Sequence, residues 1–183
     1  MRSLFAAVGV ALLAALSGVA ADTKGTTVTW ADLKSTTPAD WKEETPSSKL
    51  RQGQFKLPKA EGDKEDAEVA IFFSPGGGGI EANLKRQLAA FEPAKGKEKV
   101  TEKSEKIKVG GYDAVCQEVS GTLLKKTAPF DPNAKVTPLA GYKQIYVIFE
   151  TKDGAVASMW LRGPEKTVDM HKKGFDEWVK GFK

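Results

Sequence analysis

Residues 68–91 read EVAIFFSPGGGGIEANLKRQLAAF, and this stretch decides the predicted fold. Residues 68–74 carry apolar side chains on both alternating faces, which is typical of a strand covered on both sides of its sheet. The run ends at Pro75 and the four glycines Gly76–Gly79. Apolar residues then recur at helical spacing, at Ile80, Leu84, Leu88 and Phe91. This spacing predicts an amphipathic helix that starts at the glycine turn.

Strand patterns recur on both sides of this stretch, at residues 50–57, 100–109, 112–119, 142–150 and 155–161. Gly110-Gly111 is a two-residue hairpin turn, and Gly53 marks a bulge or a close backbone approach. Pro164 and Glu165 suit the first turn of a C-terminal helix. We therefore predict an α+β fold, a three-layer α/β/α sandwich. Its central, mainly antiparallel sheet has about six strands, with one helix after the glycine turn and one at the C-terminus.

The first 21 residues have the pattern of a secretory signal. Arg2 provides a positive start, residues 4–16 are an apolar run, and a tail of small residues ends at Ala21, where we predict cleavage. The run is shorter than the roughly 20 residues of a membrane-spanning helix, so we expect no transmembrane span after cleavage. We predict an exported protein, periplasmic or secreted. Its parts are a signal peptide at 1–21, an N-terminal extended segment at 22–48 and a single domain at 49–183.

Composition narrows the classes of function. The chain has 28 lysines and arginines against 24 aspartates and glutamates, a net charge of +4, with both signs interspersed. A nucleic-acid-binding protein gathers basic residues on one face with aromatic residues between them. Here the lysine-rich stretch 95–108 also carries three glutamates, so we predict no nucleic-acid partner. The single cysteine, Cys116, lies in an apolar strand pattern and is expected to be a core residue rather than a nucleophile.

The glycine turn is the candidate ligand site. Gly77, Gly79 and Ala82 fit the loose G-x-G-x-x-G/A spacing of dinucleotide-binding turns, and free amides at a helix start attract anions. No second buried parallel strand with a terminal acidic residue follows, which argues against a nucleotide. The predicted ligand-binding residues are Gly76, Gly77, Gly78, Gly79, Asn83 and Arg86. The structural alternative, which the high false-positive rate of this motif favours, is that the glycines only permit positive φ angles and tight packing.

Residues suited to catalysis are sparse. His171, the only histidine, falls on the apolar face of the C-terminal helix, where we expect a hydrogen-bonded residue at the core margin. A hydrolase would need His171 as its base beside Cys116 or a serine, and no G-x-S-x-G motif supports one. One histidine and one cysteine do not make a zinc site, and Asp131 and Asn133 lack calcium-loop spacing. We predict no catalytic residue, no metal site and no cofactor.

Several motifs follow one another: LRQGQFKLP at 50–58, then a charged Gly-Asp loop, then AEVAIFF, PGGGG and EANLKRQ within 67–87. Together they resemble a set of small exported bacterial proteins. Those proteins share the fold of PsbP, the extrinsic subunit of the oxygen-evolving complex, and of the yeast Ran-binding nuclear-import factor. The resemblance implies a central antiparallel sheet between helices. In that pattern a tryptophan often follows the helix arginine, whereas Gln87 stands there in this chain. No activity follows from the resemblance, because the members with known roles share only non-catalytic binding to a protein partner.

The leading hypothesis is an exported, non-catalytic binding or accessory module of unknown partner, for which a protein of the cell envelope is the candidate. Its predicted contact surfaces are the glycine turn and a long loop expected at residues 121–141, mainly Lys125 to Gly141, which contains several prolines. One alternative is a receptor for a small ligand or anion at the glycine turn. A less favoured alternative is a hydrolase that uses His171.

Overall fold

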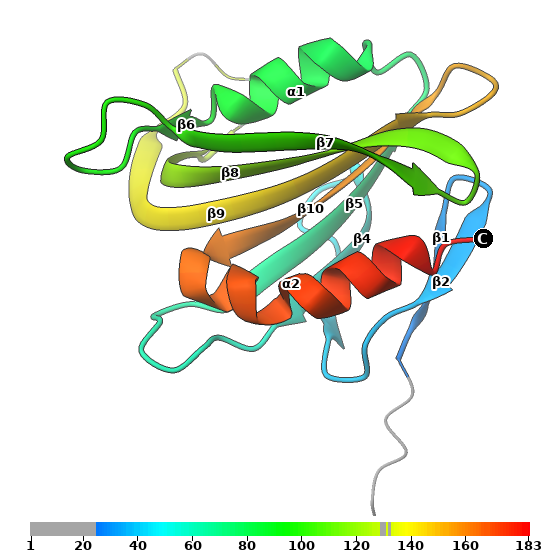
Figure 1. The fold of residues 1–183 in the computed structure, drawn as a ribbon, viewed down its shortest axis with the longest axis horizontal. Coiled ribbons are helices and arrows are strands. Elements are labelled where there is room, and N and C mark those ends of the chain that lie inside the picture. Colours follow the sequence, from blue (N-terminus) through cyan, green and yellow to red (C-terminus); the bar gives the residue numbers. More distant parts are fainter. Residues whose placement is uncertain (1–24, 129–130, 132) are drawn as a thin grey trace, which may run out of the picture.

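The computed structural model describes residues 25–128, 131 and 133–183. The predicted signal peptide, residues 1–21, lies outside the described residues. Within them, the chain is an α+β protein with one eight-stranded sheet, a separate two-stranded hairpin and two helices (Figure 1). Every strand pairing in these residues is antiparallel, as the sequence predicted.

The strands of the main sheet follow the order β3-β4-β5-β10-β9-β8-β6, and β7 also pairs with β8. The last strand of the chain, β10, therefore lies between β5 and β9 in the middle of the sheet. The strand bounds are β1 Thr27–Trp30, β2 Leu33–Thr36, β3 Lys42–Glu43, β4 Arg51–Leu57, β5 Ala67–Ser74, β6 Phe91–Glu92, β7 Thr101–Val109, β8 Tyr112–Lys126, β9 Val136–Glu150 and β10 Val156–Pro164.

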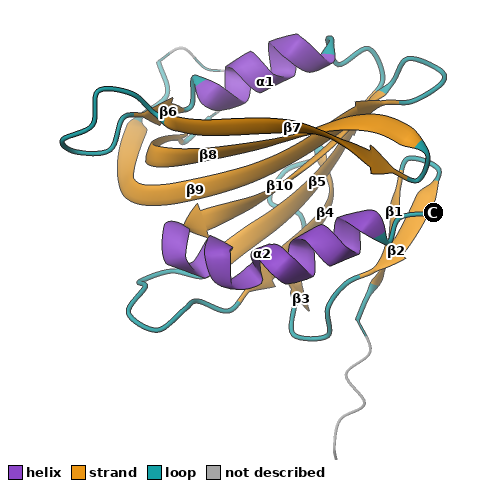
Figure 2. Ribbon diagram, viewed as in Figure 1, coloured by secondary structure: helices purple, strands orange, loops and turns teal. Residues whose placement is uncertain are grey.

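The two helices lie on opposite sides of the sheet (Figure 2). α1 (Ile80–Leu88) follows the glycine turn and α2 (Glu165–Lys180) comes last, as predicted. Successive side chains of a strand point to opposite sides of a sheet. We call the side that packs against α2 the α2 face, and the side beneath α1 the α1 face.

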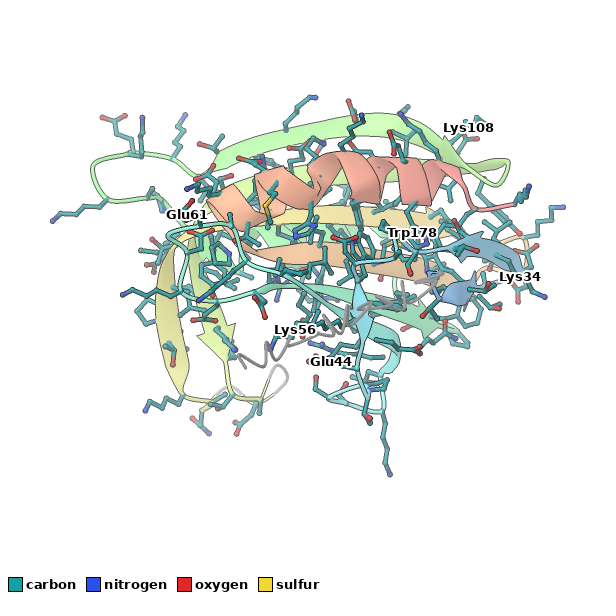
Figure 3. The ribbon with its side chains drawn as sticks, turned by 90° about the horizontal axis from the view of Figure 1, so that it is seen from below. Lys34, Glu44, Lys56, Glu61, Lys108 and Trp178 are labelled. Carbon is teal, nitrogen blue, oxygen red and sulfur yellow. The ribbon has the colours of Figure 1, made fainter. Side chains whose placement is uncertain are left out.

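The α2 face holds the main core. The predicted apolar face of α2 is buried there, through Val168, His171, Phe175, Trp178 and Val179. The ring of Trp178, labelled in Figure 3, lies 5.1 Å from Trp41, 6.4 Å from Phe55 and 5.0 Å from Phe182, measured between centroids. Such large rings bury much apolar area and pack edge to face, so this face supplies most of the hydrophobic stabilisation. Charged side chains such as Lys34 and Lys108 lie at the periphery (Figure 3).

The N-terminus of α2 is capped from a distant part of the chain. Pro164 precedes the helix and offers no side-chain cap. Asp63, in the loop between β4 and β5, instead accepts hydrogen bonds from the backbone N–H and the hydroxyl of Thr167, at 2.9 and 2.5 Å. The buried Thr167 hydroxyl accepts the N–H of Ala60 in turn, at 3.0 Å. These bonds attach the loop to the helix.

The segment 22–48, predicted to be extended, contributes to the core. It contains the β1–β2 hairpin and β3, which pairs with β4. Trp30 is fully buried, and its ring lies 4.6 Å from Phe149 and 5.3 Å from Phe182. Trp41 belongs to the same buried cluster. The domain boundary after residue 48 stays a prediction.

The predicted long loop at 121–141 is wrong. β8 runs to Lys126 and β9 begins at Val136, so the two strands form a long hairpin and only residues 127–135 connect them. Pro138 is compatible with a strand because β10 ends opposite Tyr142, which leaves this part of β9 on a free edge. The expected number of strands is also too low, because β3 and β6 have two residues each and show no periodicity.

Candidate binding site

The side chain of Asn83 holds the glycine turn. Its amide nitrogen donates to the carbonyl oxygens of Gly77, Gly78 and Gly79, at 3.2, 3.3 and 3.1 Å. Arg86 is exposed and donates to Oδ1 of the buried Asn83. The structure therefore brings the predicted site residues together through hydrogen bonds among themselves.

Backbone geometry explains three of the four glycines. Gly76 and Gly78 have φ angles of 68° and 78°, in the left-handed region that favours glycine. A Cβ atom at Gly77 would lie 2.6 Å from the Cβ atom of Ser74. These observations fit the structural alternative, and ligand binding at the turn stays a prediction.

His171 and Cys116 are buried in the core. Nε2 of His171 is 2.8 Å from the carbonyl oxygen of Pro58, and Nδ1 is 3.9 Å from a carboxylate oxygen of Asp40. Burial raises the pKa of the Cys116 thiol to about 12, so the thiol is protonated at neutral pH. The structure thus pairs His171 with a backbone carbonyl instead of a nucleophile.

A second group of polar side chains lies on the α1 face, where the strand register aligns them. Gln144, Arg162 and Glu68 stand opposite one another on β9, β10 and β5. Trp160 lies on the same side of β10, two residues before Arg162. Side chains from β4 and α1 reach the same place through hydrogen bonds. We call this group the arginine–tryptophan patch, and it consists of Arg51, Glu68, Gln87, Gln144, Trp160 and Arg162.

Trp160 is the half-buried centre of the patch. The Cζ atoms of Arg162 and Arg51 lie 3.9 and 5.6 Å from its ring centroid, within the range of cation–π contacts. The ring also packs against Phe72, with the centroids 4.6 Å apart. Its Nε1–H donates to a carboxylate oxygen of Glu68 at 3.3 Å. Trp160 is thereby held in one orientation.

Arg51 and Glu68 form an ion pair at one side of Trp160. Nη1 of Arg51 donates to Oε2 of Glu68 at 2.7 Å and to Oε1 of Gln54 at 2.7 Å. The amide nitrogen of Gln54 then donates to Glu44 at 2.9 Å. This chain of bonds fixes the direction in which the Glu68 carboxylate points.

Arg162, which also lies against the ring of Trp160, is held by neutral groups. Its Nε–H donates to Oε1 of Gln144 at 2.7 Å, and its Nη2–H donates to the same oxygen and to Oε1 of Gln87 at 3.2 Å. Among the described residues, no carboxylate forms an ion pair with Arg162. Burial lowers the pKa of the Arg162 guanidinium to about 10, although the nearby charge of Glu68 opposes this shift.

Trp160 and Arg162 of the patch are half-buried. In the part of the chain that the structure describes, two hollows lie elsewhere. One, of 390 Å³, lies among charged residues on the exterior of α2, and one, of 350 Å³, lies beside β2 and the C-terminus. Arginine and tryptophan are both enriched at the centre of protein–protein interfaces.

Sequence reasoning missed the patch because its residues come from β4, β5, α1, β9 and β10. The signal in the sequence is Trp160 and Arg162, which alternate with the apolar Met159 and Leu161 on β10. This alternation shows that one face of the strand is polar. Only the register reveals that Gln144 and Glu68 flank Arg162.

No protein-family model and no curated protein sequence matches the chain. Among solved structures, it is similar to the cyanobacterial PsbP protein of Synechocystis sp. PCC 6803, with a TM-score of 0.51 and 14% identity over 93% of this chain and 98% of that one. It is also similar to LpqN, involved in cell envelope biogenesis of Mycobacterium tuberculosis, with a TM-score of 0.50 and 13% identity over 86% and 83% of the two chains. A protein of unknown function from Pseudomonas aeruginosa matches with a TM-score of 0.47 and 15% identity, over 85% and 94%. The chain therefore has a PsbP-like fold, as its sequence pattern suggested.

Two further observations concern the described residues. Neither helix there combines the length and the apolar character needed to cross a membrane. No three histidine, cysteine, aspartate or glutamate side chains in this part of the chain are grouped as metal ligands.

Proposed function

We propose that this chain is an exported, non-catalytic binding or accessory module, built as a three-layer α/β/α sandwich. It acts after loss of residues 1–21, and its partner is a protein of the cell envelope that docks on the arginine–tryptophan patch. The observation that carries the proposal is Trp160, a half-buried tryptophan in cation–π contact with the guanidinium groups of Arg162 and Arg51.

The residue types of the patch support binding to a protein. Tryptophan and arginine dominate the few interface residues that carry most binding energy, and they act best when fixed in place before binding. Trp160 is fixed by Glu68 and Phe72, and Arg162 is fixed by Gln144 and Gln87. These side chains therefore lose little conformational freedom on association.

The charge of the patch points to an acidic partner. Arg51 is paired with Glu68, whereas Arg86 and Arg162 form no ion pair within the described residues. Burial raises the pKa of the Tyr146 hydroxyl, and the charges of Arg86 and Arg162 oppose that rise, so both guanidiniums lie near Tyr146. A complementary surface would carry carboxylates opposite this region.

The test is affinity capture with crosslinking, using residues 22–183 and the envelope fraction of the source organism. Trp160→Ala should reduce recovery of the partner about 30-fold, because truncating such an interface residue costs about 2 kcal/mol or more. Crosslinks should join the partner to residues around the patch. The matched control is Met170→Ala, since Met170 is an apolar side chain on the exterior of α2 that is 51% exposed.

Equal recovery with the wild-type protein and the Trp160→Ala variant would contradict the proposal. So would crosslinks that fall mainly on α2, together with loss of capture in the Met170→Ala control.

A further inference from the structure

The strand register offers Arg162 a counter-ion that it does not use. Arg162 stands directly opposite Glu68 in the β5–β10 pairing. Cβ atoms of opposite residues in an antiparallel pair lie about 5 Å apart, close enough for an ion pair. The guanidinium instead donates to the amide oxygens of Gln144 and Gln87. The Arg162 guanidinium therefore stands opposite the Glu68 carboxylate without forming an ion pair with it.

Glu68 points elsewhere because two other groups hold both of its oxygens. Oε2 accepts from Arg51 at 2.7 Å and Oε1 accepts from Trp160 at 3.3 Å. Arg51 is itself oriented by Gln54. Removal of Arg51 would free Oε2, and the cation that stands opposite Glu68 across the strands is Arg162.

One nitrogen of Arg162 remains open to a ligand. Nε and Nη2 are engaged by glutamine oxygens, whereas Nη1 donates to no group in the described residues. Arg162 is half-buried, so part of its side chain reaches the surface. A guanidinium binds carboxylates through its fixed fork of N–H groups, and such charge-assisted bonds are stronger than neutral ones.

We infer that Arg162 binds a carboxylate of an acidic side chain on the protein partner, and that Arg51 is a positioning residue that keeps Glu68 from occupying that place. The inference rests on the proposed docking of a protein at the patch, and it adds the chemistry of recognition. An acidic protein segment suits the patch better than a free carboxylate, because the guanidinium of Arg162 lies against the ring of Trp160, and these two residue types carry much of the binding energy at protein interfaces.

The probe is a hexaglutamate peptide, followed by ¹⁵N NMR through the Nε–H signal of Arg162 and the Nε1–H signal of Trp160. Both signals should shift on titration of the mature protein. Arg162→Gln should weaken binding about 10-fold, the loss expected for one charge-assisted hydrogen bond. Lys173→Gln removes the same charge from an exposed position on α2 and should change the affinity less than about 2-fold, because an exposed, distant charge is screened.

A pair of variants tests the role of Arg51. Arg51→Met should weaken hexaglutamate binding about as much as Arg162→Gln, and its Arg162 signal should already be displaced without peptide because Glu68 now pairs with it. Arg51→Met with Glu68→Gln should restore the affinity to within about 2-fold of wild type, because no internal carboxylate then competes. Thermal melts of both variants establish that they are folded.

Four results would overturn the inference. These are no shift of the Arg162 signal at millimolar peptide, unchanged affinity in Arg162→Gln, a double variant that binds as weakly as Arg51→Met, and acetate that binds as tightly as hexaglutamate. If Trp160→Ala abolishes capture of the partner while Arg162→Gln leaves the affinity for hexaglutamate unchanged, the docking proposal stands and this inference alone fails. If capture does not depend on Trp160, the docking proposal fails whatever the peptide does.

Discussion

The α2 face and the α1 face are formed by alternate residues of the same strands, yet their chemistry differs. On β9, Ile145 and Val147 point to the α2 face, whereas Gln144 and Tyr146 point to the α1 face. The α2 face is covered by a helix of 16 residues and the α1 face by one of 9. The first face is closed by interlocking aromatic rings, and the second leaves a tryptophan and several arginines accessible.

Under the proposed docking at the arginine–tryptophan patch, one face of the sheet stabilises the fold and the other recognises the partner. Apolar side chains that fill the space beneath α2 stabilise the fold without specifying a partner. Polar side chains on a rigid strand keep their positions because the sheet beneath them is fixed by the opposite face. The α1 face can therefore carry half-buried polar groups at a modest cost in stability, provided that each is hydrogen-bonded.

The largest expected effect compares two tryptophans. Trp30→Ala, on the α2 face, should lower the free energy of unfolding by about 3–5 kcal/mol, because it empties a fully buried site beside Phe149 and Phe182. Trp160→Ala should cost about 1–2 kcal/mol, since its ring is half-buried and its main contacts are with Phe72 and Arg162. Urea denaturation measures both. Equal losses of unfolding free energy in the two variants would show that the two tryptophans, and the faces they lie on, contribute equally to stability.

The next effect concerns how α2 is anchored. Asp63→Ala should destabilise the protein by about 1–2 kcal/mol, because the backbone N–H of Thr167 loses the carboxylate that caps the helix. Glu61→Ala is the control, because Glu61 lies in the same loop but contacts α2 only through its backbone oxygen. The free energies of unfolding of the two variants, measured by chemical denaturation, should differ by the contribution of the helix cap. A Glu61→Ala variant that is equally destabilised would assign the effect to the loop as a whole.

A smaller effect depends on pH at the rim of the α2 face. Burial raises the pKa of Glu118, but hydrogen bonds and charge from Lys172 and Lys143 outweigh it, so the pKa lies below its ordinary value. The ionised group therefore stabilises the fold fully above its unfolded pKa of about 4.3, and this contribution, up to about 1 kcal/mol, is lost as pH falls through the folded pKa.

Thermal melts from pH 7 to pH 3 check this dependence. The melting temperature of Glu118→Gln should lie below that of wild type at neutral pH, and the gap should close in acid. Glu105→Gln, on the exposed strand β7, should show no such gap. A gap for Glu118→Gln that persists unchanged at pH 3 would contradict the assignment.

The smallest effect is a gain at the start of α1. Gly79 occupies the N-cap position with extended φ and ψ of −68° and 161°, has no side-chain cap, and leaves open space for a Cβ atom. Gly79→Ser should therefore stabilise the protein by about 0.3 kcal/mol. Gly78→Ala is the contrast, because φ is +78° there and a side chain should destabilise by about 1 kcal/mol. A destabilised Gly79→Ser would show that the turn tolerates no side chain.

The elements that the sequence predicted well are those with strong local patterns. The strand, glycine turn and helix around residues 68–88 were found because periodicity changes at a clear breaker, and the hairpin at Gly110-Gly111 was found from its turn residues. The β1–β2 hairpin was missed because its strands have four residues each, and its tryptophan is buried by residues from the far end of the chain. Pro138 and Gly141 suggested a loop where β9 in fact continues along a free edge.

The two candidate sites also differ in whether local sequence patterns reveal them. The glycine turn is local, so its residues could be named from spacing, and the structure adds that Asn83 bonds to three of its carbonyls. The arginine–tryptophan patch depends on which strands are neighbours, and that is a property of register. No spacing in the sequence relates Arg51 to Trp160, which are more than 100 residues apart.

The central place of β10 has a consequence for how the protein is made. β10 is the last strand in the chain, and it joins β3, β4 and β5 on one side to the strands from β6 to β9 on the other. Within the described residues, the two halves of the sheet share no strand pairing before residues 156–164 are available. A chain that emerges from the ribosome N-terminus first therefore completes this sheet only after β10 has emerged. Such late, long-range pairing slows folding.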